Sequence, residues 1–435
     1  MADPNTIRVL CFDGGGARGY LSLCWFQHFV NQWGVTPSAI ANNVDVICGA
    51  SVGGMIGLSL GFGLTPDDDP DTGMFKFFIN DAPYIFSLSS LIPSWRPNAL
   101  TKGALALAGI PFYQSSGPTA DSYGYGKLVV TLQETFGSNT LQNLNTKVII
   151  PSYREDTKSY VLFSNVTNGR FVGPNSLISD VALATGSPPF YMPSWTFGGH
   201  TYIDGGVYQN NPANFGVMLG KMLKPNAKRI CLLSVGTGRG ELGFDPEGSD
   251  GIPLANDPLA TTSGSSTVIV TVPTTSILTN GQNVTLSGAT DTGGIAAVNL
   301  NITASISIIN STTFSYIAGG SASSMTTGGG PAVVLDYIAP SASLLTTNPI
   351  NDLYELFEIA QTGGQESVAE TFLLQSLYTL DQFYYYRFNP VLDPLQNTEL
   401  DNTDPEVYVY YNELAETLYN EDNINISNFL GHWTA

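Results

Sequence analysis

The sequence predicts a three-layer α/β/α fold that is interrupted by an inserted all-β domain. Two apolar runs typical of strands, residues 7–12 and 44–48, each lead into a glycine-rich turn and then into an apolar, helix-like segment. Strands that alternate with helices in this way favour a parallel sheet with helices on both faces. The composition changes after about residue 247 and changes back after about residue 343, which divides the chain into 1–247, 248–343 and 344–435.

The first strand is followed by a cluster of small residues, in which Gly14, Gly15 and Gly16 precede Arg18 and Gly19. Successive residues without side chains at the start of a helix can direct several backbone N–H groups at one anion. The cluster lacks the Gly-Lys-Ser or Gly-Lys-Thr ending of a P-loop, but Gly14, Gly16 and Gly19 match the dinucleotide fingerprint G-x-G-x-x-G. Taken alone, these residues leave a dinucleotide phosphate site and an oxyanion hole both open.

The second strand leads into Gly49-Ala50-Ser51-Val52-Gly53, which has the spacing G-x-S-x-G. In a nucleophile elbow the residues two positions either side of the serine must be small, because strand and helix nearly touch there. An ordinary turn is the alternative. Residues 46–64 carry no charge, as in a membrane-spanning helix, but their many glycines make a poor isolated helix. We therefore predict a buried strand, a sharp turn and a closely packed helix.

A third motif lies far along the chain, where Asp204, Gly205 and Gly206 precede an Asn-Asn-Pro sequence. A dinucleotide site has no use for this motif. With the three motifs in this order, the chain resembles the patatin-like phospholipases over about residues 6–247, and again from about residue 348 to the end. Segments 182–193, 233–238 and 386–388 agree with the same pattern.

The resemblance implies a patatin-like α/β hydrolase that cleaves acyl esters of phospholipids or galactolipids without a metal or an organic cofactor. Ser51 is then the nucleophile and Asp204 its base partner. The resemblance also implies an oxyanion hole made by Gly14, Gly15, Gly16 and Arg18. The nucleophile elbow is then formed with Gly49 and Gly53. An inactive structural or attachment protein and a lipid acyltransferase remain as alternatives.

The base that activates Ser51 is a separate question, since histidine usually takes this role. The chain has three histidines, and only His432 follows the serine and the acid in the order of an α/β-hydrolase triad. A Ser-Asp dyad without histidine is what the resemblance implies. Such an aspartate should be partly desolvated, because its ordinary pKa makes it a weak base. The alternative for Asp204 is an Asx turn in a glycine-rich loop.

The charge, the first residues and the cysteines limit the partners, the location and the thiol state that we expect. With 36 acidic and 16 basic residues the formal net charge is −20, so we expect no nucleic-acid partner, and peripheral lipid contact through apolar side chains. The first residues lack the basic segment followed by an apolar segment that is typical of a secretory signal, so we expect a cytoplasmic protein. The four cysteines lie in apolar patterns, which favours buried free thiols.

The segment 248–343 predicts a β-sandwich whose strands include 267–272, 283–287 and a long alternating run over 298–308. Its composition weakly resembles β-modules of phage tails and other virion-associated proteins. That leaves two interpretations, a structural insertion or a module that binds a particle or cell surface. Residues 353–359, 368–380 and 413–419 are predicted to be helical. Head group, acyl position, chain length, activator, oligomeric state and cellular or viral origin do not follow from the sequence.

Overall fold

The chain folds into two units. In the computed structural model the described residues are 4–67, 69, 72–86, 125–189, 191–239, 252–272, 275, 278, 280, 281, 283–337, 382–393, 396 and 398–435. The first unit comprises Met1–Arg239, Asn348–Pro390 and Thr398–Ala435; the second comprises Gly240–Thr347 and Val391–Asn397. The short segment Val391–Asn397 thus belongs to the second unit, although the sequence pattern placed it in 344–435 with the first.

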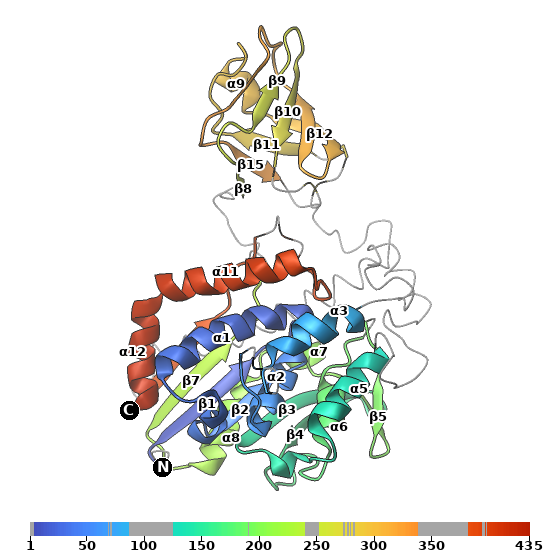
Figure 1. Ribbon diagram of the computed structural model, residues 1–435, viewed down its shortest axis with the longest axis vertical. Helices are drawn as coiled ribbons and strands as arrows, with labels where there is room; N and C mark the ends of the chain where they lie inside the picture. The colour runs from blue at the N-terminus through green and yellow to red at the C-terminus, as the bar shows by residue number, and fades with distance from the viewer. Residues whose placement is uncertain are drawn as a thin grey trace. The chain divides into compact units, whose positions relative to one another are not determined.

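The first unit is built on one mixed sheet with the strand order β16-β7-β1-β2-β3-β6-β5, and β4 also pairs with β3 (Figure 1). The first five of these strands are mutually parallel. They are β16 (Gln382–Phe388), β7 (Arg229–Val235), β1 (Thr6–Phe12), β2 (Val46–Gly49) and β3 (Lys147–Arg154). The antiparallel strands are β4 (Ser159–Ser164), β5 (Trp195–Phe197) and β6 (His200–Asp204). The strand after the second unit thus completes the sheet begun before it.

Helices cover both faces of this sheet, and every residue of the central strand β1 is therefore buried. On one face α8 (Ala213–Leu223) packs on Ile7 and Val9, and on the other the ring of Phe12 meets Phe26 of α1 (Gly19–Trp33). The other helices are α2 (Val52–Phe62), α3 (Ala82–Ile85), α5 (Tyr125–Phe136), α6 (Ile178–Thr185), α7 (Gly206–Gln209), α11 (Pro405–Glu421) and α12 (Asn423–Thr434), with a π-helical turn at Phe77–Asp81. The predicted three-layer α/β/α fold is confirmed.

The uncharged run at 46–64 is a strand, a turn and a helix of 11 residues, as predicted. In the part of the chain that the structure describes, no helix has both the length and the apolar character needed to cross a membrane. The four cysteines are buried and free, which confirms that prediction. The helix predicted at 413–419 lies within α11, whereas those predicted at 353–359 and 368–380 lie outside the described residues.

The second unit contains an antiparallel sheet with the strand order β14-β9-β10-β13-β12-β11-β15-β8. Alternate residues of β10, such as Val268 and Val270, face a core that includes Phe314 and Tyr316. The strands are β8 (Ile252–Pro253), β9 (Leu259–Thr261), β10 (Thr267–Thr271), β11 (Asn283–Ser287), β12 (Thr303–Asn310), β13 (Thr313–Ile317), β14 (Thr326–Gly328) and β15 (Val334–Tyr337). This unit therefore has an apolar core of its own.

One strand prediction in this unit is wrong. The alternating run at 298–308 was expected to be a single strand, but residues 297–300 form the short helix α9 (Ala297–Leu300) and β12 begins at Thr303. The Asp291 carboxylate accepts a hydrogen bond from the Ala297 N–H at 2.7 Å and so satisfies a free donor at the start of this turn. Leu300 is then buried, whereas Val298 is 75% exposed.

Candidate active site

Ser51 stands in the sharp turn between β2 and α2. Its φ of 53° and ψ of −129° place a non-glycine residue in a strained region of the backbone. Its N–H donates a hydrogen bond to the Thr185 hydroxyl at 3.0 Å, and that hydroxyl donates to the Pro151 carbonyl at 2.7 Å. The strained conformation is thus held by α6 and β3, two elements distant in the sequence.

The glycines two positions either side of Ser51 are required by close backbone packing. A Cβ atom on Gly49 would overlap the carbonyl oxygen of Gly53, and a Cβ on Gly53 would overlap the carbonyl oxygen of Phe12. Strand β1, strand β2 and the first turn of α2 therefore meet at van der Waals distance. This is the physical reason for the spacing G-x-S-x-G predicted to form an elbow.

The glycine cluster after β1 lies directly beside the serine. A Cβ on Gly14 would be 3.0 Å from the Cβ of Ser51. The Gly14 N–H donates to the Asn210 carbonyl at 3.2 Å, and the Gly14 carbonyl accepts from the Thr237 hydroxyl at 2.8 Å. Within the described residues, the N–H groups of Gly15 and Gly16 have no acceptor. Two adjacent backbone donors are therefore available next to the Ser51 side chain.

Asp204 ends β6 and is completely buried. One carboxylate oxygen accepts the Gly206 N–H at 2.6 Å, while the other, Oδ2, has no hydrogen-bond partner in the described parts of the chain. Burial raises the pKa of Asp204 to about 7; the neighbouring Ser51 side chain and the Gly206 N–H oppose part of this rise. The Ser51 side chain thus lies near the carboxylate, although it does not complete a hydrogen bond to Oδ2.

A small apolar pocket of about 50 Å³ opens over Ser51. Gly15, Gly16 and Ser51 lie in its wall, so the glycine cluster and the serine border one space. The other residues of the wall are Val52, Met55, Phe77, Phe78, Ile85, Phe86, Leu128, Gly186, Pro188, Tyr191, Met192 and Leu400. Phe77, Phe78, Ile85 and Phe86 come from the aromatic segment that follows Gly73. The wall of this pocket is therefore mostly apolar.

The three histidines lie elsewhere and none lines the Ser51 pocket. His28 stacks on Tyr419 at 5.3 Å, and His432 stacks on Tyr384 at 3.7 Å between the ring centroids. His200 is bonded through Nδ1 to the exposed Asp156 carboxylate at 2.8 Å. The structure therefore does not bring His432 to Ser51, although its position in the sequence suits a triad.

Arg18 follows the glycine cluster, and its N–H donates to the Gly15 carbonyl at 3.1 Å. Burial raises the pKa of Tyr411 in α11, and the charge of Arg18 opposes that rise, so the guanidinium lies near this tyrosine. The Arg18 Nε is buried without a hydrogen-bond partner within the described ranges. The role of Arg18 in the oxyanion hole, which the family resemblance implies, stays a prediction.

Four residues that support the site were not predicted individually. Thr185 holds the elbow, and Asn210 and Thr237 hold Gly14, whose carbonyl also accepts the Asn210 amide at 3.2 Å. Arg387 of β16 makes an ion pair with the buried Asp13 at 2.6 Å and donates to the Ser234 hydroxyl at 2.8 Å. All four lie in segments that the family pattern had marked, but only the fold shows what they contact.

Comparison with known proteins agrees with this geometry. Residues 10–215 match the family model described as patatin-like phospholipase. These residues form a patatin-like phospholipase domain. Relatives include the cGAMP-activated phospholipase of Vibrio cholerae serotype O1, 26% identical over 255 residues, and patatin-like protein 4 of Arabidopsis thaliana, 27% identical over 229 residues.

These matches are partial. They cover 56% of this chain and 67% of the Vibrio protein, and 49% of this chain and 52% of the Arabidopsis protein. Among solved structures, VipD from Legionella pneumophila aligns over 56% of this chain and 52% of its own, with 15% identity and a TM-score of 0.33.

Proposed function

We propose that the protein hydrolyses lipid acyl esters through an acyl-Ser51 intermediate, with Asp204 as the base. The observation that carries the proposal is the buried Asp204 carboxylate, whose Oδ2 has no partner among the described residues while the Ser51 side chain lies beside it. Ser51 and two free N–H groups face one apolar pocket, which is the set of groups that acyl transfer requires.

In the first half of the reaction Asp204 accepts the hydroxyl proton of Ser51 as Oγ bonds to the ester carbonyl carbon. The carbonyl oxygen becomes an oxyanion, which the N–H groups of Gly15 and Gly16 stabilise. The bond to the lipid alcohol then breaks, and the alcohol leaves with the proton from Asp204. In the second half Asp204 accepts a proton from water, the hydroxide oxygen bonds to the acyl carbon, and Ser51 leaves with that proton as fatty acid is released.

The protonation of Asp204 suits this role near neutral pH. An ordinary aspartate is too weak a base for a serine hydroxyl, but a pKa of about 7 makes the carboxylate a much better proton acceptor. A positioned base contributes about 10² to 10⁴ in rate, and one oxyanion donor about 10² to 10³. We assign Gly14 to holding the loop, since its N–H is already bonded to the Asn210 carbonyl.

The test compares the wild type with Ser51→Ala and Asp204→Asn on vesicles that contain phospholipid and galactolipid. Released fatty acid and lyso-lipid are measured by mass spectrometry. We expect release by the wild type and a loss of at least about 10³-fold in each variant, because each removes one partner of the dyad. His432→Ala is the matched control and should retain activity. Loss of turnover in His432→Ala, or turnover by Ser51→Ala, would refute the assigned dyad.

An added alcohol distinguishes hydrolysis from acyl transfer, since both use the same acyl-enzyme. Glycerol or a lyso-lipid is included, and the new ester is measured beside the free fatty acid. We expect free fatty acid as the main product. The surface-binding role of residues 248–343 stays a prediction.

A further inference from the structure

Asn210 carries a buried amide oxygen that has no donor. The residue is 2% exposed, and its Oδ1 has no hydrogen-bond partner in the parts of the chain that the structure describes. A buried acceptor without a donor is unfavourable, so each one needs an explanation. The amide nitrogen has an ordinary structural role, since Nδ2 donates to the Gly14 carbonyl at 3.2 Å. That bond does not explain the oxygen.

The Asn210 oxygen lies beside the proposed nucleophile. A Cβ on Gly14 would be 2.2 Å from Asn210 Oδ1 and 3.0 Å from the Ser51 Cβ, so both atoms lie within 3.0 Å of one point. Asp204 is near the same serine side chain, and its Oδ2 is a second buried acceptor without a partner among the described residues. The short helix α7 joins Asp204 to Asn210. Two buried acceptors without donors are therefore near Ser51.

One water molecule has the donors that these two oxygens need. The Ser51 hydroxyl has a single hydrogen, and in the acyl-enzyme that hydrogen is gone, because Oγ carries the acyl group and the proton has left with the lipid alcohol. Asp204 Oδ2 and Asn210 Oδ1 then both lack a donor. Water has two O–H groups and can donate one to each oxygen. An alcohol has only one O–H group and would place a carbon atom against the other oxygen, which is unfavourable.

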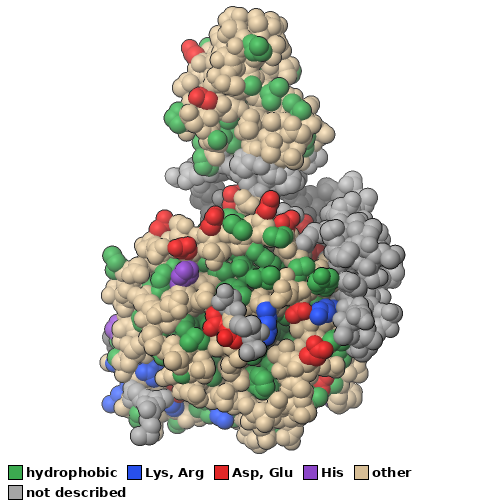
Figure 2. All heavy atoms as spheres, in the orientation of Figure 1, with side chains coloured by type: hydrophobic (Ala, Val, Ile, Leu, Met, Phe, Trp, Pro, Cys, Tyr) green, Lys and Arg blue, Asp and Glu red, His purple; other side chains and the backbone are tan. Residues whose placement is uncertain are grey.

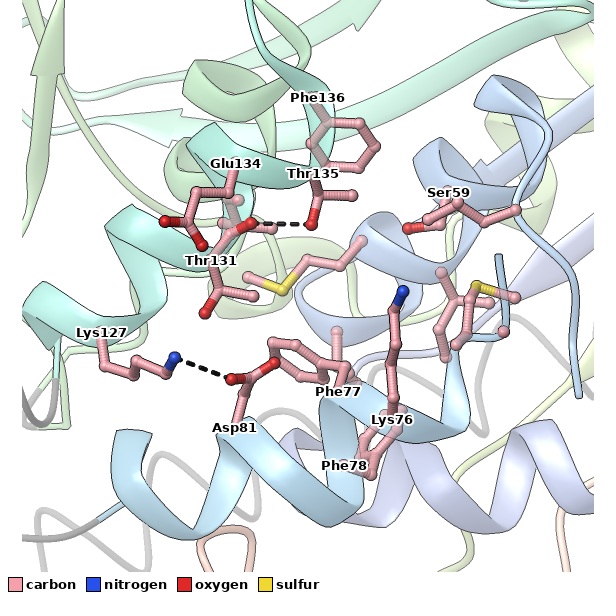
Figure 3. A pocket seen from close by; sticks show the side chains of 17 residues that line it. Ser59, Lys76, Phe77, Phe78, Asp81, Lys127, Thr131, Glu134, Thr135 and Phe136 are labelled. Atoms are coloured by element: carbon pink, nitrogen blue, oxygen red, sulfur yellow. Dashed lines mark hydrogen bonds and ion pairs between the residues drawn. The ribbon is translucent and has the colours of Figure 1, made fainter. Parts of the chain in front are cut away.

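A polar cavity beside the site is a source of this water. The cavity has a volume of about 410 Å³ and adjoins the Ser51 pocket, since Val52, directly after the nucleophile, lines both. Among the described residues, charged side chains line only the larger of these two cavities. Lys127 and Asp81 in its wall form an ion pair at 2.9 Å (Figure 3). Charged groups of this kind retain water, so water is available next to Ser51.

We infer that Asn210 positions the water that hydrolyses the acyl-enzyme, and so directs the acyl group to water rather than to an alcohol. The water donates one O–H to Asn210 Oδ1 and the other to Asp204 Oδ2. Asp204 takes the second of these protons as the water oxygen bonds to the acyl carbon. The bond from that carbon to Ser51 Oγ then breaks, and Oγ takes the proton from Asp204. The O–H that faced Asn210 leaves with the fatty acid. This inference rests on the proposed function.

The test measures how the acyl-enzyme divides between water and an alcohol with a single O–H group. A soluble short-chain nitrophenyl ester is the acyl donor, 1-propanol is added, and free acid and propyl ester are measured by mass spectrometry. Asn210→Leu removes the amide oxygen and keeps a side chain of similar size. The ratio of acid to propyl ester should fall by about tenfold, the order expected for one lost hydrogen bond. Asn210→Ala adds no bulk and should lower the ratio too.

Thr237→Val is the matched control. It removes the other side-chain hydrogen bond to the Gly14 carbonyl, at 2.8 Å, and leaves the Asn210 oxygen in place. We expect it to slow the formation of both products and to keep the wild-type ratio of acid to propyl ester. A role for Asn210 that is limited to holding Gly14 would change the ratio equally in the Asn210 and Thr237 variants, or in neither. Either result would overturn the inference.

The same samples separate this inference from the proposed function. Turnover by the wild type and none by Ser51→Ala, together with an unchanged product ratio in both Asn210 variants, would refute the role of Asn210 and leave the hydrolase proposal standing. Turnover by Ser51→Ala at the wild-type rate, or no turnover of the ester by the wild type, would refute the hydrolase proposal and the role of Asn210 together.

Discussion

Glycines beside Ser51 in the first unit and glycines in exposed turns of the second unit have different roles. In the first unit a Cβ on Gly49, Gly53 or Gly205 would overlap a backbone carbonyl, so these glycines allow main chains to approach closely. In the second unit Gly264 and Gly281 have φ of 78° and 83° with nothing within 4 Å of an added Cβ, so they serve only to reverse the chain. Close backbone contact at the first three glycines thus holds Ser51 and its neighbours in place. The second unit has one such contact of its own, because a Cβ on Gly288 would lie 1.8 Å from the Ala332 carbonyl oxygen.

Charge is distributed just as unevenly. The first unit buries Asp204 and the ion pair of Asp13 with Arg387, although burial of charge is unfavourable unless it is compensated. The second unit has an apolar core, and Figure 2 shows its surface as mostly uncharged, with separate apolar side chains. Desolvated charge therefore accompanies the chemistry, whereas the β unit is held by apolar packing.

Gly53→Ala tests the comparison most strongly. The new methyl group must displace the backbone of β1 or of α2, which costs several kcal/mol by overpacking and moves Ser51. We expect loss of ester turnover and a strongly lowered melting temperature. Gly264→Ala is the matched change in the second unit; it meets only backbone strain and should cost about 1 kcal/mol. If both variants lowered the melting temperature equally, close backbone packing at Gly53 would not differ in its effect from the open turn at Gly264.

Arg387→Met should have the next largest effect. Its loss leaves the Asp13 carboxylate, which is completely buried, without its ion-pair partner at the start of the glycine loop. Removing one partner of a buried pair costs about 3–5 kcal/mol. We expect that loss in chemical denaturation, together with a lower turnover number, because Asp13 directly precedes Gly14. Arg170→Met, at an exposed position, is the control. If Arg387→Met were as stable as this control, Arg387 would not stabilise the buried Asp13 carboxylate.

The pH profile is expected to change turnover more moderately. Asp204 must be deprotonated to accept the Ser51 proton, and burial raises its pKa to about 7. Activity should therefore fall as the pH falls through 7, by about tenfold for each unit below it. Initial rates on a soluble monoester between pH 5 and 9 would check this, with unfolding curves at each pH as the control. A rate independent of pH from 5 to 8 would mean that Asp204 is not the base.

The sequence predicted those parts of the site that depend on local geometry. The G-x-S-x-G spacing reflects contacts within a single turn and its neighbouring strands, so Gly49, Ser51 and Gly53 could be recognised in a linear pattern. The desolvation of Asp204 was also expected, because a base of ordinary aspartate strength would not serve. The assignment of roles to Ser51 and Asp204 stays a proposal.

Long-range contacts could not be predicted in the same way. Thr185 is 134 residues from Ser51, and Arg387 is 374 residues from Asp13, and no spacing rule relates them. The wrong strand at 298–302 has a related cause. Alternating apolar side chains indicate a strand only when the backbone N–H groups can bond to a neighbouring strand. Here the Ala297 N–H donates to the Asp291 carboxylate instead, and a short helix forms.

Phe314→Ala should have the smallest effect on turnover and the clearest effect on the β unit. Phe314 is completely buried in a core formed wholly by residues of the second unit, so its truncation should cost that unit about 3–5 kcal/mol. Hydrogen exchange should rise in peptides from 252–337 while monoester turnover stays at the wild-type value. Ile317→Ala, at a position that is 59% exposed, is the control and should change neither readout. A parallel loss of turnover and exchange protection in Phe314→Ala would show that the β unit supports the active site, and that the separation of roles between the two units is incomplete.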